Sequence, residues 1–257
     1  MDFKVKGHSD SKLYIKNDNG VHLVVKESEN TRLLKSISKH SEFNSKYFKT
    51  PNIHSIYPDA NPNMAYIMDF INGYSFFEFL NLCSKNDLDK FISKLEGYFN
   101  ETILDTIKIP TNILAKKLNK IGYYDDYYFI FNGEESLNVY TGNCHGDMTL
   151  SNMIFKDDDV YLIDFLDSYI ESPTMDLIKL RQDTHVNWSF NMIDSRSSDL
   201  IKSKIALKYI DDWIVDTYDM SNYKTLQIIN LARILPYTYD EKIKTFIKDK
   251  IKMIWES

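Results

Sequence analysis

The stretch of sequence that decides the fold is NCHGDMTLSNMIFKDDDVYLIDFLD, residues 143–167. A polar loop here runs into a short apolar strand, turns at three consecutive aspartates and returns along a second apolar strand that ends in an acid. Because a two-strand ribbon brings its two ends together, we expect Asp147, Asn152 and Asp164 to converge on one point. Two carboxylates and an amide oxygen are hard ligands, the kind that Mg²⁺ prefers when substrate phosphates complete its shell.

The same stretch carries a family motif. H-G-D-x-x-x-x-N at residues 145–152, followed by apolar-apolar-D-F at 162–165, resembles the aminoglycoside phosphotransferase and choline kinase-like family, which has a protein-kinase-like fold. SPTMDL at 172–177 resembles the start of a helix in that family. The resemblance implies an α+β, two-lobed fold, with a small antiparallel β N-lobe at residues 1–70 and a larger helical C-lobe at residues 71–257.

The resemblance also implies roles for four residues. Asp147 would be the catalytic base that orients an acceptor hydroxyl and takes its proton, and His145 would brace the catalytic loop beside it. Asn152 and Asp164 would hold the Mg²⁺ that bridges the phosphates of ATP or GTP. Phosphoryl transfer depends mainly on positioning and charge neutralisation, so this small set is chemically sufficient. The residues alone also allow a polar turn in which His145 and Asp147 are only hydrogen-bond anchors.

Lys26 is the candidate contact to the nucleotide. It follows two valines at the end of a predicted strand, and by family likeness it would reach the α and β phosphates. Such a lysine needs a carboxylate on the following helix. Glu42 is our candidate, because its helical spacing can turn it toward the same cleft, and Glu29 is the alternative. A lysine that simply leaves a strand into solvent is the competing interpretation.

Two further segments are weaker candidates for the nucleotide site. GHSDSK, which contains Ser9 and Ser11, stands where a loop would cover the nucleotide, although the glycine-rich phosphate motifs are absent from the chain. MDFING, which contains Asp69 and Ile71, resembles the connector between the lobes whose backbone meets adenine. A plain edge strand followed by a turn is the alternative for MDFING.

Periodicity and turn residues outline the rest of the chain. The N-D-N-G turn at residues 17–20 predicts a hairpin, and Ser75 with Glu78 has the spacing of a helix capping box. Strands are predicted at residues 13–16, 21–26, 53–57, 64–70, 153–156 and 160–164. Helices are predicted at residues 29–46, from 75 onward, and at 88–104, 111–121, 174–183, 199–218, 223–235 and 241–255.

Composition excludes several classes of protein. The formal net charge of −6 argues against a nucleic-acid partner, and two cysteines without a C-x-x-C make no disulfide framework. We find no apolar run of about 18 residues and no apolar signal core at the N-terminus, so we expect no membrane span and a cytoplasmic location.

The motif favours a small molecule over a protein as the acceptor. Protein kinases place an arginine where Gly146 stands, often a lysine where Thr149 stands, and a glycine where Leu166 stands. The acceptor is therefore expected to be a hydroxyl of a sugar, an amino sugar or an amino alcohol such as choline, chosen by the helices after Asp183. These helices carry several acids, which would suit a cationic acceptor or would merely form solvated helix faces. They are Asp183, Asp211, Asp212, Asp216 and Glu241.

Two other classes of function remain open. The first is a catalytically degenerate kinase fold that binds nucleotide or a partner without turnover, for which the late position of Glu42 is the main argument. The second is a metal-dependent phosphohydrolase built on the same loop residues around two metals. Such sites usually need several more histidines, and only His185 follows the loop.

Overall fold

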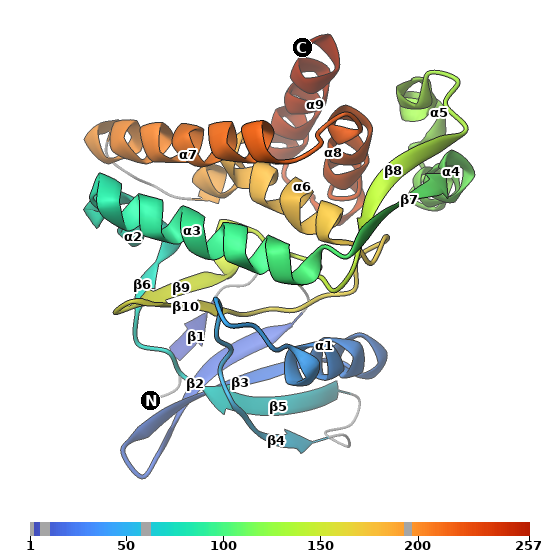
Figure 1. Ribbon diagram of the computed structural model, residues 1–257. Coiled ribbons are helices and arrows are strands. Elements are labelled where there is room, and N and C mark those ends of the chain that lie inside the picture. The colour runs from blue at the N-terminus through green and yellow to red at the C-terminus, as the bar shows by residue number, and fades with distance from the viewer. Residues whose placement is uncertain (1–2, 6–10, 58–62, 193–196) are drawn as a thin grey trace.

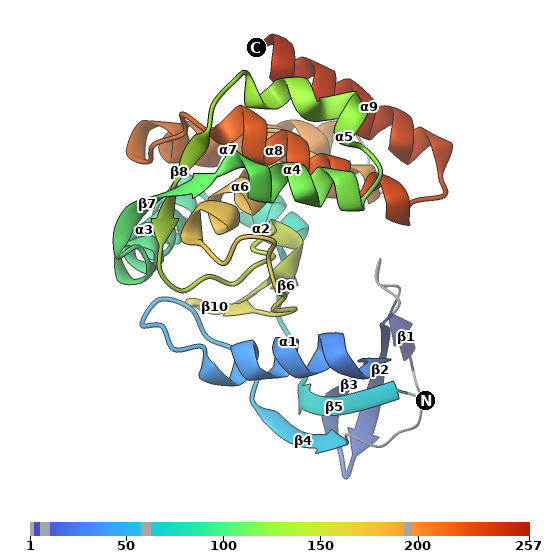
Figure 2. The same cartoon turned by 90° about the vertical axis from the view of Figure 1, so that its right-hand side faces the viewer.

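The small lobe is an antiparallel sheet covered by one helix, as predicted (Figure 1). The computed structural model describes residues 3–5, 11–57, 63–192 and 197–257. The sheet has the strand order β1-β2-β3-β5-β4, and α1 packs against one of its faces (Figure 2). The elements are β1 Phe3–Val5, β2 Lys12–Asp18, β3 Val21–Glu29, α1 Asn30–Glu42, β4 Ile53–Tyr57 and β5 Asn63–Asp69.

Alternation along β3 places Lys26 beneath α1. Val24 packs with the buried residues of α1, whereas Val25 packs on the opposite face of the sheet. Because successive side chains of a strand point to opposite faces, Lys26 shares the face of Val24, and only 4% of its surface is exposed. β3 also continues past Lys26 to Glu29, so the lysine lies within the strand and not at its end.

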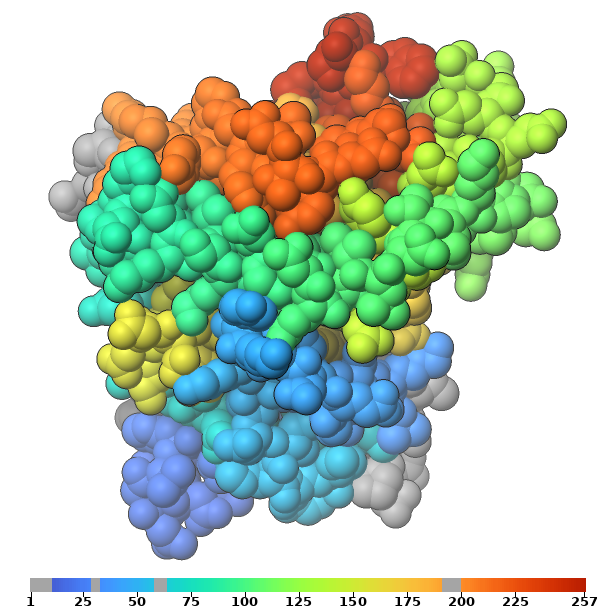
Figure 3. Space-filling view, in the orientation of Figure 1, coloured from blue at the N-terminus to red at the C-terminus, as the bar shows by residue number. Residues whose placement is uncertain are grey.

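The chain leaves α1 earlier than predicted because it crosses to the large lobe. α1 ends at Glu42 instead of near residue 46. The Phe48 side chain is then buried in the core of the large lobe, and Lys49 forms backbone hydrogen bonds with Val160 and Leu162 of 3.0 and 2.8 Å. This segment therefore joins the two lobes, and in Figure 3 its blue atoms reach up to the green atoms of the large lobe.

The large lobe is mainly helical and contains two small antiparallel sheets. In Figure 1, α3 and α7 run side by side above β9 and β10. Its longer helices are α2 Phe76–Leu82, α3 Lys85–Thr102, α4 Thr111–Lys120, α6 Pro173–Thr184, α7 Ser197–Thr217, α8 Tyr223–Ala232 and α9 Glu241–Glu256. Its strands are β6 Tyr74–Ser75, β7 Asp105–Pro110, β8 Ser136–Thr141, β9 Met153–Lys156 and β10 Asp159–Leu162. Its short helices are α5 Tyr124–Tyr127, η1 Tyr128–Phe131, η2 Leu150–Asn152, η3 Trp188–Met192 and η4 Leu235–Tyr237.

The centre of the large lobe is α6. Every residue of this helix is buried except Lys179. Leu177 and Leu180 join the apolar cluster around α2, α3 and β9, whereas Met175 and Ile178 join the cluster around α8 and α9. A helix that is buried on all sides forms the middle of a core, so α6 is the fixed element against which the neighbouring loops pack.

Two features of the large lobe were not predicted. β7 pairs with β8 in a ribbon that projects from the helices, and β6 adds a third strand to the predicted pair β9 and β10. The capping box at Ser75 and the strand at Met153–Lys156 are as predicted. None of the helices in the described ranges is long and apolar enough to cross a membrane.

Candidate active site

The loop after β8, which carries H-G-D, approaches the segment after β10 very closely. Gly146 has φ 88°, and a Cβ at this position would lie 1.9 Å from the backbone oxygen of Leu166. Only glycine combines this left-handed conformation with so close an approach of two backbones. The loop at residues 143–152 and the segment at residues 163–167 are therefore packed together, which brings their acidic side chains into one region between the lobes.

Asp176 on α6 fixes the start of this loop. Its carboxylate accepts hydrogen bonds from the backbone N–H of His145 at 2.7 Å and of Gly146 at 2.8 Å, and from the Tyr98 hydroxyl at 3.0 Å. The residue is fully buried, and burial raises its pKa to about 6 in spite of these donors. Near neutral pH the carboxylate thus remains an acceptor that holds the two backbone amides in place.

Asp183, one residue from the end of α6, fixes the end of the loop in the same way. It accepts hydrogen bonds from the backbone N–H of Leu150 at 2.7 Å and from the hydroxyl of Ser189 at 2.6 Å. It is fully buried, and burial raises its pKa to about 6. Asp183 was a candidate for binding a cationic acceptor, but its oxygens serve the catalytic loop instead.

His145 connects the loop to the segment after β10. Its Nδ1 accepts a hydrogen bond of 3.2 Å from the backbone N–H of Asp147, so the proton is assigned to Nε2, which donates to the Ile163 oxygen at 3.0 Å. The ring also packs on Phe165, with 4.2 Å between the ring centres. Burial lowers the pKa of His145 to about 4, so the ring is neutral, and both nitrogens are engaged by backbone groups. This geometry fits a brace better than a proton donor.

Asp147 lies between an amide and a lysine. Asn152 Nδ2 donates to Asp147 Oδ2 at 3.1 Å and to its backbone oxygen at 2.8 Å, and Lys179 Nζ lies 2.9 Å from Asp147 Oδ1. Burial alone raises the pKa of Asp147, but the ammonium of Lys179, together with His145 and the Asn152 amide, outweighs burial and holds the pKa below the ordinary value. Lys179 was not among the predicted site residues, since it lies 32 positions after Asp147 and no local pattern links them.

Asp164 meets Lys26 across the two lobes. Lys26 Nζ donates to Asp164 Oδ1, and the two side chains are 5% and 33% exposed. Asp164 has φ 61°, a left-handed conformation that aspartate tolerates better than most residues and that often marks functional sites. The site thus combines a strand of the small lobe with the two loop segments of the large lobe.

The oxygens of this site suit a hard divalent cation. Asn152 uses its Nδ2 for Asp147, which leaves Oδ1 for another partner, and Asp164 uses Oδ1 for Lys26, which leaves Oδ2. An amide oxygen and a carboxylate oxygen next to a phosphate site are the ligands that Mg²⁺ takes. Across the residues that the structure describes, there is no group of three or more His, Cys, Asp or Glu side chains arranged to hold a metal.

The structure corrects the predicted pair of Lys26 and Glu42. Glu42 is exposed at the last position of α1, where it accepts a hydrogen bond of 2.6 Å from the Ser38 hydroxyl. α1 instead reaches the large lobe through Ser36 and Lys39, which donate to the backbone oxygens of Phe165 and Leu166. Asp164 provides the carboxylate for Lys26, and the alternative partner, the Glu29 side chain, lies outside the described part of the structure.

The predicted nucleotide-covering loop lies mostly outside the described residues. Ser9 falls in the range 6–10, which the structure does not describe, and Ser11 is half-buried just before β2. In the register of the sheet, Leu13 lies opposite Lys26, so Ser11 is two residues from the position that faces the lysine. A contact of either serine with a phosphate stays a prediction.

The connector between the lobes begins at Asp69, whose side chain is already engaged. Its carboxylate accepts hydrogen bonds from the backbone and side chain of Asn52 at 3.1 and 2.7 Å, and it pairs with His54 at 2.6 Å. These contacts join β4 to β5. Ile71 follows as a half-buried residue before β6, and a contact of this connector with adenine stays a prediction.

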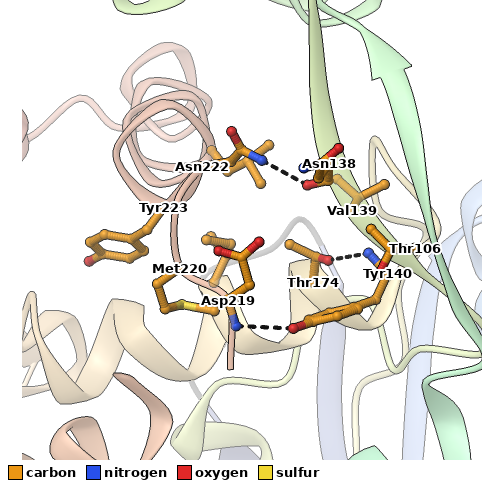
Figure 4. A pocket seen from close by; sticks show the side chains of 11 residues that line it. Thr106, Asn138, Val139, Tyr140, Thr174, Asp219, Met220, Asn222 and Tyr223 are labelled. Carbon is orange, nitrogen blue, oxygen red and sulfur yellow. Dashed lines mark hydrogen bonds between the residues drawn. The ribbon is translucent and has the colours of Figure 1, made fainter. Parts of the chain in front are cut away.

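A small pocket lies elsewhere in the large lobe, between the ribbon β7–β8 and the start of α8 (Figure 4). Hydrogen bonds cross it from Asn222 to the Asn138 oxygen at 2.9 Å and from the backbone N–H of Asp219 to the Tyr140 hydroxyl at 3.0 Å. None of the residues that line it belongs to the candidate active site.

Comparison with protein families gives one partial match. Residues 64–180 match the sequence model of the ecdysteroid kinase-like family. The matched segment runs from β5 through most of α6 and includes the loop with H-G-D and the segment with D-F, but not Lys26. A comparison with curated protein sequences found no match.

Solved structures resemble the whole chain. A thermostable mutant of aminoglycoside phosphotransferase APH(4)-Ia, in ternary complex with ADP and hygromycin B, has a TM-score of 0.61 at 9% identity, covering 100% of this chain and 93% of its own. A protein provisionally named fructosamine-3-kinase from Haemophilus somnus 129PT has a TM-score of 0.53 at 11% identity, covering 100% and 90%. A provisionally named aminoglycoside phosphotransferase from Ralstonia eutropha JMP134 has a TM-score of 0.55 at 12% identity, covering 100% and 91%.

These matches confirm the predicted fold and the predicted resemblance. The chain has a protein-kinase-like fold with a small antiparallel β lobe and a larger helical lobe, as the motif in residues 143–167 indicated. At such low identities the likeness to solved structures establishes the fold alone. The reaction and the acceptor therefore have to be inferred from the residues of the site.

Proposed function

We propose that the protein is a small-molecule kinase that transfers the γ-phosphoryl group of ATP or GTP to a hydroxyl group. The observation that carries this proposal is the meeting of Lys26 from the small lobe with Asp164, next to Asn152 and Asp147 of the catalytic loop. One strand of one lobe and two segments of the other supply, at one place, a cation, two acids and an amide. Those are the groups that phosphoryl transfer uses.

The nucleotide would bind between the lobes with its phosphates at Lys26. Lys26 is nearly fully buried beneath α1, so its ammonium is held in place and can move from Asp164 to a phosphate oxygen over a short path. Asn152 Oδ1 and Asp164 would hold the Mg²⁺. When bound, the metal neutralises negative charge on the phosphates. The backbone of the connector after Asp69 is the proposed contact for the base.

Asp147 would act as the general base. Its pKa lies below the ordinary value, so it is ionised at neutral pH and can accept a proton. In the reaction the acceptor oxygen forms a bond to the γ-phosphorus, the bond from that phosphorus to the β–γ bridging oxygen breaks, and the hydroxyl proton passes to Asp147. The nucleoside diphosphate leaves with the bridging oxygen. His145 and Asp176 would keep Asp147 in position through the backbone of the loop.

The acceptor would be a sugar, an amino sugar or an amino alcohol. The absence of an arginine before Asp147 and of a lysine two residues after it separates this motif from that of protein kinases. Asp211 does not remain available for a cationic acceptor, because Arg181 pairs with it at 2.8 Å and the Thr184 hydroxyl donates to it. Acceptor binding is therefore expected to depend on other groups near Asp147.

The test is an assay of ADP release from Mg·ATP in the presence of a panel of sugars, amino sugars and amino alcohols. We expect Asp147→Asn to lower the rate by about 10²-fold to 10⁴-fold, the usual contribution of a positioned general base. Asp125→Asn, an exposed carboxylate on α5, should match the wild type.

Equal rates for Asp147→Asn and the wild type would show that Asp147 is not the base. Release of phosphate from phosphate monoesters in the absence of nucleotide would favour the phosphohydrolase. Binding of nucleotide without ADP release with any acceptor would favour the degenerate, non-catalytic kinase fold.

A further inference from the structure

Lys179 is placed unlike any other residue of α6. It is the one residue of that helix that is not buried, and its side chain is 14% exposed beside Asp147. Its Nζ lies 2.9 Å from Asp147 Oδ1 and 3.4 Å from the side-chain oxygen of Gln182, one helical turn further on. The ammonium therefore lies at the rim of the core, directly next to the proposed base.

The lysine contacts Gln182, whose side-chain amide is bound in turn by an amide of α8. Gln182 Oε1 also accepts a hydrogen bond of 2.7 Å from Asn230 Nδ2. Gln182 and Asn230 are 3% and 1% exposed, so this part of the helix packing is polar although it lies in the core. Burying polar groups is costly unless they serve each other or a further group. Their arrangement fixes Gln182 as an acceptor that points Lys179 toward the active site.

The contacts of Lys179 leave it able to bind a ligand. An ammonium has three N–H donors, and the interactions within the described residues use two of them, for Asp147 and Gln182. The other two lysines close to the site contact the segment after β10 and not Asp147, Lys26 through Asp164 and Lys39 through Glu171 and the Leu166 oxygen. Lys179 is therefore the lysine on the Asp147 side of the site that has donor capacity to spare.

The reaction creates a need for a cation at this place. An acceptor hydroxyl bound to Asp147 lies in line with the γ-phosphorus, so the oxygens of the transferring group come within a few ångströms of the base. Protein kinases often have a lysine two residues after the base, where this chain has Thr149. Thr149 is buried, and its hydroxyl is within 2.9 Å of Ser151. The catalytic loop itself thus offers no cation to that group.

We propose that Lys179 is a catalytic residue whose ammonium binds the γ-phosphoryl group during transfer. From α6 it supplies the positive charge that no side chain of the catalytic loop provides. This inference rests on the proposed function, because it presumes that a nucleoside triphosphate binds with its γ-phosphate next to Asp147. In the absence of nucleotide, Lys179 is shared by Asp147 and Gln182. In the complex its third donor meets an oxygen of the γ-phosphate.

The test is calorimetric titration of Mg·ADP and of Mg·AMP-PNP, which differ in the γ-phosphate, into the full-length wild type, Lys179→Met and Lys179→Arg. We expect the wild type to bind Mg·AMP-PNP more tightly than Mg·ADP. Lys179→Met should lose about tenfold or more of that preference, as for one charged hydrogen bond, with Mg·ADP affinity within about twofold of the wild type. Lys179→Arg should keep most of the preference. Lys49→Met, which removes a lysine paired with Asp159 at the surface, is the matched control and should change neither affinity.

Three results would overturn the inference: an unchanged preference in Lys179→Met, an equal loss of both affinities, or a wild type that does not distinguish the two nucleotides. An equal loss of both affinities would mean that Lys179 only supports the fold of the site. Failure of the wild type to bind either nucleotide is a different result, because it contradicts the proposed function itself.

Discussion

The two segments that form the site are held in different ways. The catalytic loop at residues 143–152 is fixed from within its own lobe by buried acceptors, Asp176 and Asp183, that bind its backbone N–H groups. The segment at residues 164–171 packs on this loop through Phe165 and Leu166, and side chains of β3 and α1 in the other lobe also bind it. The proposed base, Asp147, thus lies in the part of the site that its own lobe fixes, whereas Asp164, the proposed metal ligand, lies where the two lobes meet.

This difference assigns separate tasks to the two segments. A base must stay within hydrogen-bond reach of the acceptor, which buried and fully satisfied contacts achieve. Under the proposed function, a nucleotide enters and leaves between the lobes. The contacts of Lys35 and Lys39 with the segment are at least partly exposed, and such ion pairs are weak in water. These two ion pairs are therefore expected to add little to the free energy that holds the lobes together.

The largest effect on stability is expected where the two segments touch. Gly146→Ala would place a Cβ 1.9 Å from the Leu166 oxygen at φ 88°, so the two backbones must move apart. We expect it to lower the free energy of unfolding by about 2–4 kcal/mol. Gly122→Ala is the control, since Gly122 has φ 77° with no atom within 4 Å and should cost only about 1 kcal/mol. Equal losses in urea unfolding of the two variants would contradict the close packing of the segments.

A second, somewhat smaller effect concerns the brace at His145. Burial lowers its pKa to about 4 in the folded protein, against about 6.5 in the unfolded chain. A group with a lowered folded pKa contributes its full stability above the unfolded pKa and loses it as the pH falls toward the folded pKa. Between pH 7.5 and pH 5 the stability advantage of the wild type over His145→Gln should therefore shrink by about 2 kcal/mol. A constant difference in urea unfolding across that range would mean that His145 is not buried as a neutral ring.

The smallest effect is expected at the contact between the lobes. Lys26→Met should lower the free energy of unfolding by about 1 kcal/mol or less, because Asp164 is one-third exposed and water can solvate it once the lysine is removed. Thermal and urea unfolding would measure this. A loss as large as that of Gly146→Ala would show that the ion pair holds the fold together. It would contradict the view that the contact between the lobes matters less for stability than the packing within the large lobe.

The sequence predicted the fold because the motif is local. The loop, the turn and the two strands of residues 143–167 lie next to one another in the chain, so their spacing and their apolar pattern are visible without a structure. The hairpin at Asn19 and Gly20 is equally local, with φ 51° and 88° at the turn as that dipeptide requires. The ribbon β7–β8 was missed because its strands are about 30 residues apart, so no short turn joins them in the sequence.

Contacts between distant segments explain what the sequence did not reveal about the site. Helical spacing made Glu42 a partner for Lys26, but it could not show that α1 ends at that residue with the carboxylate in solvent. Lys179 meets Asp147 only because α6 crosses beneath the loop, and Asp164 meets Lys26 only because the lobes close on each other. Each of these contacts is set by tertiary packing, which leaves no periodic mark in the chain.

The most direct test of the central claim is nucleotide binding that depends on both magnesium and Asp164. Thermal and calorimetric titrations of ATP and GTP, each with Mg²⁺ and with chelator, would compare the wild type with Asp164→Asn. Asp159→Asn is the control, since it removes a surface carboxylate at the other end of β10. We predict stabilisation of about 2.7 kcal/mol at a ligand concentration of about 100 times Kd, in the wild type and the control. In Asp164→Asn, or with chelator, most of it should be lost. Magnesium-dependent binding that is unchanged in Asp164→Asn, or no binding of either nucleotide to the wild type, would contradict the kinase assignment.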